Sequence, residues 1–242
     1  GSPAMGQDIT ATVTGLDWAC GSEGCSLTAA PRIDFVFGAD PTGTRLVTDE
    51  TNVFEFSLTR ATDALATLAV KGRAPKTGYS RDQFGAAWSD VDRNGCDTRN
   101  DILRRDLVRT TVRNCVVYSG VLYDPYTRKV IQHERGRYGV DIDHVVALGN
   151  AWQTGAFRWP SEQRKEFAND PLNLLAVDSS ANRQKGDGDA ATWLPANKSY
   201  RCAYVARQIA VKAKYRLWVT PPEKAAMKRV LTACPGQRIP AS

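Results

Sequence analysis

The chain has 242 residues, of which 42% are hydrophobic and 24% charged, a balance that is ordinary for a folded globular protein and excludes wholesale disorder. No apolar run approaches the roughly 18 residues of a membrane-spanning helix, so we expect no membrane span. The net charge of +6 and the isoelectric point near 9.1 favour polyanionic partners such as nucleic acid.

The N-terminal part of the chain is expected to form a small β-rich accessory module. Residues 1–6 have the composition of an expression leader, so we assign the module to residues 7–60. Short runs rich in Thr, Val and Phe, separated by turn signals, predict strands at residues 9–16, 32–37, 44–47 and 52–58. The module contains no histidine and no catalytic constellation. Its role stays open between a structural or targeting unit and a domain that recruits substrate.

The six cysteines allow 15 disulfide pairings. Proximity along the chain and the expected elements favour three local pairs, Cys20–Cys25, Cys96–Cys115 and Cys202–Cys234. A structural zinc site needs closely spaced ligand pairs such as Cys-x-x-Cys, and none is present. An even number of cysteines without metal-ligand spacing indicates an oxidising compartment, so we expect a disulfide-bonded protein that is secreted or held in the cell envelope.

Residues 61–242 are expected to form one larger domain of mixed α and β structure. Residues 61–70 are interpreted as an extended or helical bridge, and the basic residues 71–78, which include Gly and Pro, as a boundary loop. Capping-box patterns then predict two helix starts, at Ser80 with Gln83 and at Thr98 with Asp101.

A hairpin and two helices follow from local patterns in the rest of this domain. Residues 115–123 and 129–132 flank an Asp-Pro turn and predict the hairpin. Residues 202–213 carry apolar side chains at helical spacing. Residues 220–223, Thr-Pro-Pro-Glu, combine an N-cap residue, a proline in the first turn and a capping-box acid, which predicts the start of the second helix.

The stretch from Asp141 to Lys185 is the most informative part of the sequence. Asp-Ile-Asp-His at residues 141–144 ends one apolar run, and Asn-Leu-Leu at residues 173–175 begins another. An Asn-x-x-Lys sequence, Asn182 to Lys185, then follows at an expected helix start, where a serine at 179 or 180 can provide the cap. We therefore expect two strands and a helix around a single site.

The chain contains only two histidines, which narrows the search for a general base. His133 lies in the second arm of the hairpin and is interpreted as an exposed or hydrogen-bonded surface residue. His144 suits proton transfer, because a neutral imidazole with a pKa of about 6.5 can accept a proton from water. Neighbouring strand residues point to opposite faces, so His144 would face water and Asp143 a cation. Asn182 would supply the opposing oxygen ligand, and Lys185 would contact a phosphate oxygen.

The Asp-His pair, the Asn-Leu sequence and the Asn-x-x-Lys sequence together resemble the HNH endonucleases with a ββα-metal (His-Me) finger. The chain is most similar to the branch with Asp-His and a terminal Asn, which includes GmrSD-type HNH domains and secreted bacterial nucleases. Further similarity to the secreted branch lies at residues 78–81, 94–99, 123–126, 167–170, 185–189 and 193–195. The resemblance covers roughly residues 65–234. It implies an α+β fold, with a ββα-metal nuclease core, flanking helices and the β-rich module before it.

The resemblance also implies a metal-binding pair and a catalytic set. The two protein ligands are Asp143 and Asn182. The family name calls for a histidine at the second ligand position, and the asparagine here favours Mg²⁺ or Mn²⁺ over Zn²⁺. The implied catalytic set is His144 as the general base, Asn173 as the residue that holds the histidine loop by side-chain hydrogen bonds, Lys185 as the basic residue after the last ligand, and Arg99 as a phosphate clamp.

The expected function is that of a secreted, monomeric, metal-dependent endonuclease that hydrolyses DNA, with RNA left open as a second substrate. Contacts to phosphate would dominate recognition, which favours low sequence specificity and a strong dependence of binding on salt. One alternative is a nuclease selective for DNA structure or modification, with the β-rich module choosing the substrate. Another is an envelope- or surface-binding protein that carries a degenerate nuclease fold.

Overall fold

The computed structural model describes residues 18–21, 24–27, 44–48, 53–57 and 59–240, and the chain divides into two units at residues 58 and 59. In the first unit, two antiparallel pairs are formed by β1 (Trp18–Gly21) with β2 (Gly24–Leu27) and by β3 (Thr44–Thr48) with β4 (Val53–Ser57). The strands predicted at residues 44–47 and 52–58 are confirmed. Those predicted at residues 9–16 and 32–37 lie outside the described residues. Cys20 is opposite Cys25 in the β1–β2 register, but the predicted bridge between their side chains also lies outside them.

The second unit has an α+β fold, as predicted. Its strands are β5 (Val108–Arg113), β6 (Val116–Tyr123) and β7 (Val130–Glu134), which form one antiparallel sheet in that order, and β8 (Val140–His144) and β9 (Leu174–Asp178), which form a separate antiparallel pair. The predicted hairpin is confirmed as β6–β7. Strand β5 was not predicted, because its residues, Val-Arg-Thr-Thr-Val-Arg, are mostly exposed and show no apolar alternation.

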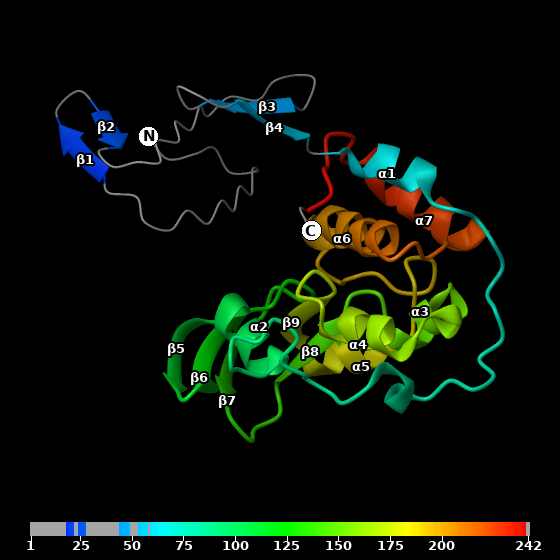
Figure 1. Ribbon diagram of the computed structural model, residues 1–242, viewed down its shortest axis with the longest axis horizontal. Helices are drawn as coiled ribbons and strands as arrows, with labels where there is room; N and C mark the ends of the chain where they lie inside the picture. Colours follow the sequence, from blue (N-terminus) through cyan, green and yellow to red (C-terminus); the bar gives the residue numbers. More distant parts are fainter. Residues whose placement is uncertain (1–17, 22–23, 28–43, 49–52, 58, 241–242) are drawn as a thin grey trace. The chain divides into compact units, whose positions relative to one another are not determined.

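Helices cover both sides of the β8–β9 pair. They are α1 (Ala61–Thr67), α2 (Thr98–Asp106), α3 (Leu148–Gln153), α4 (Ser161–Asn169), α5 (Ser179–Lys185), α6 (Arg201–Lys214) and α7 (Pro221–Thr232), with 3-10 turns η1 (Arg81–Phe84), η2 (Ala156–Arg158) and η3 (Lys198–Tyr200). Helices α1 and α7 lie against α6 (Figure 1). Within the described ranges, no helix is long and apolar enough to cross a membrane.

Strand β9 is buried along its whole length, and its side chains alternate between two hydrophobic clusters. Leu175 and Val177 pack into the cluster formed with α1, α6 and α7. Leu174 and Ala176 pack into the cluster formed with α2, β6 and β8. The β8–β9 pair is therefore held between two cores, which fixes the position of the residues at its ends.

Two of the three proposed disulfides are present among the described residues. Cys96 and Cys115 join the loop before α2 to the turn between β5 and β6, with their Cα atoms 5.4 Å apart. Cys202 and Cys234 join α6 to the chain just after α7, with their Cα atoms 6.4 Å apart. The second bond ties the two C-terminal helices together, as predicted. The capping box predicted at residues 220–223 is also confirmed at the start of α7.

Three of the predicted helix caps need correction. Helix α2 is capped by Asp97 and not by Thr98. Helix α5 is capped by Asp178 and not by either of the serines that follow it. In both helices the carboxylate accepts the backbone N–H three residues further on, which is the bond that an N-cap supplies. Ser80 makes no side-chain cap, and η1 after it is a single 3-10 turn.

The loop before α2 is rich in oxygen side chains. Residues 90–95, Asp-x-Asp-x-Asn-Gly, followed by an acid at residue 101, have the ligand spacing of an EF-hand calcium loop, with Asp in place of the final Glu. In the structure, the Asp90 carboxylate accepts the backbone N–H groups of Asn94 and Gly95 at 3.1 and 3.0 Å. Gly95 has a φ of +88°, so the loop turns at the residue that accommodates this conformation best.

The interpretation of His133 as a surface residue is wrong. The residue lies on β7 and is only 4% exposed. Neither ring nitrogen has a hydrogen-bond partner among the described residues. Burial lowers the pKa of His133, and the positive charge of Arg99 acts in the same direction. The ring is therefore neutral in the folded protein near pH 7.

Candidate active site

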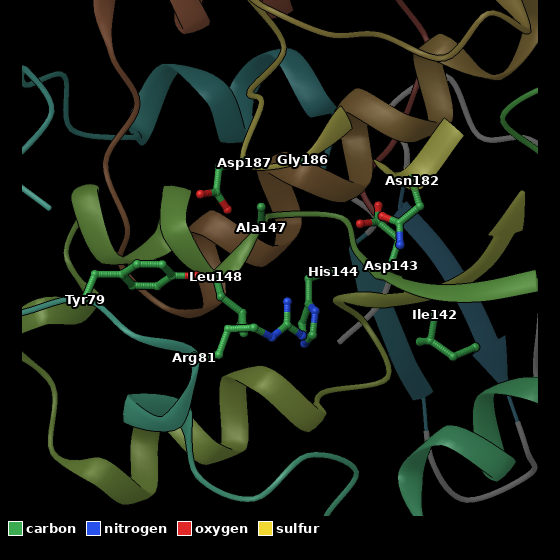
Figure 2. A pocket seen from close by; sticks show the side chains of 10 residues that line it. All are labelled: Tyr79, Arg81, Ile142, Asp143, His144, Ala147, Leu148, Asn182, Gly186 and Asp187. Atoms are coloured by element: carbon green, nitrogen blue, oxygen red, sulfur yellow. The ribbon is translucent and has the colours of Figure 1, made fainter. Parts of the chain in front are cut away.

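A pocket of about 450 Å³ opens beside the C-terminal end of β8 (Figure 2). It is lined by Tyr79, Arg81, Ile142, Asp143, His144, Ala147, Leu148, Asn182, Gly186 and Asp187. These residues come from η1 and the loop before it, from β8 and the start of α3, and from α5 and the loop after it. The Asp-His and Asn-x-x-Lys segments, which are distant in the sequence, therefore meet at one cavity.

His144 is the last residue of β8, and its ring is fixed by the neighbouring helix α4. Its Nε2 lies 2.9 Å from the carbonyl oxygen of Ala168, in the last turn of α4. A carbonyl oxygen can only accept, so the proton is on Nε2 and the lone pair of the neutral ring is on Nδ1. Nδ1 has no partner among the described residues. The ring of Trp88 stacks over the imidazole, at 13° and 6.3 Å between centroids.

Asn173 holds the loop that follows His144. Its Oδ1 accepts the N–H of Val146 at 2.8 Å, and its Nδ2 donates to the carbonyl of the same residue at 3.3 Å. Its own carbonyl accepts the N–H of Val145 at 2.8 Å. Asn173 is fully buried and does not line the pocket. Its hydrogen bonds therefore fix the backbone of the loop that follows His144.

Asp143 is buried and accepts a hydrogen bond at each carboxylate oxygen. Tyr126 donates its hydroxyl to Oδ2 at 2.6 Å, and Lys185 donates its ammonium to Oδ1 at 2.9 Å. Burial raises the pKa of Asp143, although Lys185 and the Tyr126 hydrogen bond oppose the rise. Burial, together with the charge of Asp143, raises the pKa of Tyr126 well above its ordinary value, so its hydroxyl remains a donor. The carboxylate is thus held in one orientation at the pocket wall.

Asn182 lies in α5, beside Asp143 at the pocket wall (Figure 2). Its Nδ2 donates to Oδ2 of Asp141 at 3.3 Å, and this hydrogen bond sets the orientation of the side-chain amide. Its Oδ1 accepts no hydrogen bond from any residue that the structure describes. Within the described ranges, no three His, Cys, Asp or Glu side chains are grouped as a metal site, either at this pocket or away from it. The pocket therefore offers a cation the free amide oxygen of Asn182 and the remaining lone pairs of Asp143. Asp187 also lines the pocket, and its Oδ2 is paired with Lys76.

Lys185 and Arg99 differ from the positions expected for phosphate-binding residues. The Lys185 side chain is 0% exposed, and its ammonium donates to Asp143 and to the His144 carbonyl, the latter at 2.8 Å. Its ammonium therefore holds the Asp143 carboxylate and the His144 backbone, and Lys185 does not line the pocket. Arg99 lies in the first turn of α2, near His133, and does not line the pocket.

The structure adds three residues that the sequence analysis did not assign to the site. Tyr126 orients Asp143, the Ala168 carbonyl orients His144, and Arg81 lines the pocket. Each lies in a segment already noted for its similarity to secreted nucleases, at residues 78–81, 123–126 and 167–170. The similarity of those segments was therefore a usable signal, but it did not say which side chain faced the site.

The buried imidazole gives the protein a defined loss of stability in acid. Burial, partly opposed by the hydrogen bond to Ala168, lowers the pKa of His144 to about 4. Between that value and the ordinary value near 6.5 the unfolded chain binds a proton that the folded chain does not, so stability falls as the pH falls through this range. The expected slope is about 1.4 kcal/mol per pH unit from this group alone.

Urea unfolding of wild type and His144→Gln in EDTA, at pH 7 and pH 5, checks this. The substitution removes the titrating ring, so the variant should lose about 2 kcal/mol less than wild type between the two pH values. His133 contributes the same sign in both proteins and cancels from the comparison. An equal loss in both would contradict the assignment of a depressed pKa to His144.

Known proteins match most of the second unit. Residues 97–230 match the family described as the C-terminal domain of GmrSD restriction endonucleases. The chain is also 40% identical, over 181 residues, to a protein of Arthroderma benhamiae named "Uncharacterized secreted protein", and the alignment covers 74% of this chain and 86% of that relative. No solved structure matches the chain. The secreted relative and the two disulfide bonds agree on an extracellular location. On the match over residues 97–230, this chain belongs to the family of the GmrSD restriction endonuclease C-terminal domain.

Proposed function

We propose that the chain is a metal-dependent HNH endonuclease that hydrolyses phosphodiester bonds in DNA, and in RNA as a second substrate, with β8, β9 and α5 as its ββα-metal finger. One observation carries the proposal. A single pocket is lined by an imidazole with a free nitrogen, a fixed carboxylate and a free amide oxygen, from His144, Asp143 and Asn182. Phosphodiester hydrolysis with a divalent cation needs a proton acceptor and oxygen donors of this kind.

His144 would accept the proton of the attacking water at Nδ1, because Nε2 is held by the Ala168 carbonyl. Its pKa of about 4 keeps the ring neutral, and so able to accept a proton, throughout the neutral range. A nearby anion favours the protonated form of an imidazole. The phosphate of a bound substrate would therefore make His144 more basic at the point where the proton is transferred.

Asp143 and Asn182 would hold the divalent cation. Their oxygen atoms are hard ligands, which suit Mg²⁺ or Mn²⁺ better than Zn²⁺. Two protein ligands fit Mg²⁺, because this ion usually binds through one or two side chains and completes its shell with water and phosphate oxygens. When bound, the ion supplies positive charge for the phosphoryl and leaving oxygens. Lys185 and Tyr126 position the carboxylate that would bind it.

Recognition of nucleic acid would depend mainly on phosphate contacts. The chain carries 32 Lys and Arg against 26 Asp and Glu, which favours association with a polyanion. Contacts to phosphate position a protein on nucleic acid without reading its sequence. We therefore infer low sequence specificity, with the N-terminal β-rich module as a candidate for recruiting the substrate.

Incubation of the purified chain with supercoiled plasmid tests the function. Nicked and linear products are expected with Mg²⁺ or Mn²⁺, less product with Zn²⁺, and none with EDTA. Rates should fall as salt is raised, because counterion release contributes to binding. Absence of cleavage with every cation would contradict the proposal. Retained binding to cell-wall material under those conditions would favour the surface-binding alternative.

A further inference from the structure

The pocket contains one cationic side chain that is not neutralised by a neighbour. Lys76 does not line the pocket and is paired at 2.5 Å with Asp187, which does. Lys185, below the pocket, is paired with Asp143. Arg81 lines the pocket and is exposed, and its guanidinium makes no hydrogen bond or ion pair with any residue that the structure describes. Figure 2 shows this guanidinium beside the ring of His144.

The backbone that carries Arg81 is firmly anchored. Phe84, at the other end of η1, is 1% exposed and packs against Trp152 and Phe167. Arg164 of α4 donates from Nε to the carbonyl of Gln83 at 2.6 Å. Helix α4 therefore holds η1 near its middle and holds His144 through Ala168 near its end. One helix therefore positions both the backbone that carries Arg81 and the ring of His144.

A guanidinium in this position matches the chemistry of a phosphate diester. Its planar set of N–H donors can bind two oxygens of one phosphate, and it stays charged at every working pH. An unpaired arginine beside a base and two oxygen donors also places positive charge where negative charge develops during hydrolysis. No other described residue that lines the pocket carries an unpaired positive charge.

We propose that Arg81 binds a non-bridging oxygen of the scissile phosphate, the role that the sequence analysis assigned to Lys185 and Arg99. This inference rests on the proposed nuclease function. It makes Arg81 a substrate-binding residue, with its charge opposite the oxygen donors of Asp143 and Asn182 across the pocket. Replacement by lysine keeps the charge but loses the planar, preorganised set of N–H donors, so the variant should retain binding better than turnover.

Cleavage of plasmid in Mg²⁺ by full-length Arg81→Ala, Arg81→Lys and Arg229→Ala is the first test. Arg229 is exposed on α7, which contributes no residue to the pocket, so its replacement removes the same charge elsewhere. We expect kcat/KM to fall roughly 10²- to 10³-fold for Arg81→Ala and less for Arg81→Lys. The Arg229→Ala variant should cleave like wild type. Added guanidinium ion at non-denaturing concentration should restore part of the rate in Arg81→Ala alone.

Binding of a short DNA duplex in EDTA, measured by fluorescence anisotropy over a range of salt concentrations, is the second test. Loss of one phosphate contact should reduce the slope of log K against log salt by about 0.9 in Arg81→Ala. A slope equal to wild type, or cleavage equal to that of Arg229→Ala, would overturn the role of Arg81. If wild type binds the duplex but cleaves nothing, the nuclease function is refuted. In that case the slope of log K against log salt still decides whether Arg81 contacts phosphate.

Discussion

His144→Ala is expected to reduce phosphodiester turnover roughly 10²- to 10⁴-fold, the contribution that a positioned proton acceptor makes to hydrolysis. The Nε2 atom of the ring lies 2.9 Å from the Ala168 carbonyl oxygen, which leaves Nδ1 free to accept the proton. The other histidine of the chain, His133, is buried on β7 and does not line the pocket, so it cannot replace His144. Initial rates of plasmid nicking in saturating Mn²⁺ measure the loss.

Measuring Mn²⁺ affinity distinguishes the loss of the proton acceptor from the loss of a metal ligand. His144 contributes no oxygen donor, so the Mn²⁺ concentration that gives half-maximal binding should be unchanged in His144→Ala. Asn182→Ala removes the free amide oxygen and should raise that concentration as well as lowering the rate. Electron paramagnetic resonance of free Mn²⁺ measures binding without turnover. Wild-type cleavage by His144→Ala would end the assignment of His144 as the base.

The sequence predicted the two segments that meet at the pocket, because their chemistry is local. An Asp-His pair at a strand end and an Asn-x-x-Lys at a helix start each have a spacing that is set by a single element. Asn173, immediately before β9, accepts the N–H of Val146 in the loop that follows His144, and this contact too comes from a residue at the end of a strand. Contacts set by a single element or its ends are therefore the ones that a sequence pattern indicates.

The sequence did not show how deeply a side chain is buried or which distant segments are in contact. Lys185 lies on the expected helix, yet nothing in the spacing shows that β8 and α5 bury its ammonium against Asp143. Arg81 comes to the pocket from an earlier segment, held by a packing contact between η1 and α4 that has no periodic signal. The capping residues were displaced because acids compete with Thr and Ser for the same N–H groups.

Lys185→Met is expected to destabilise the folded protein by about 3–5 kcal/mol, the cost of leaving one charge of a buried pair without its partner. The side chains of Lys185 and Asp143 are 0% and 5% exposed, so water cannot replace the lost ammonium. The apolar methionine fills similar space, which leaves the uncompensated carboxylate as the cause of the loss. Urea unfolding in EDTA measures it, and Arg183→Met, at an exposed position of the same helix, should change stability by less than about 0.5 kcal/mol.

A second substitution identifies the partner on which Lys185 acts. In the double variant Lys185→Met/Asp143→Asn the buried negative charge is gone, while Tyr126 still has an oxygen to which it can donate. This variant should be more stable than Lys185→Met alone, although both should be inactive because the carboxylate is misplaced or missing. If Lys185 instead reached a phosphate, Lys185→Met would raise KM and leave the free energy of unfolding near that of wild type. Recovery of stability by a change at Asp143 is the result that only the buried ion pair predicts, because a phosphate-binding lysine would have no energetic coupling to that carboxylate in the absence of substrate.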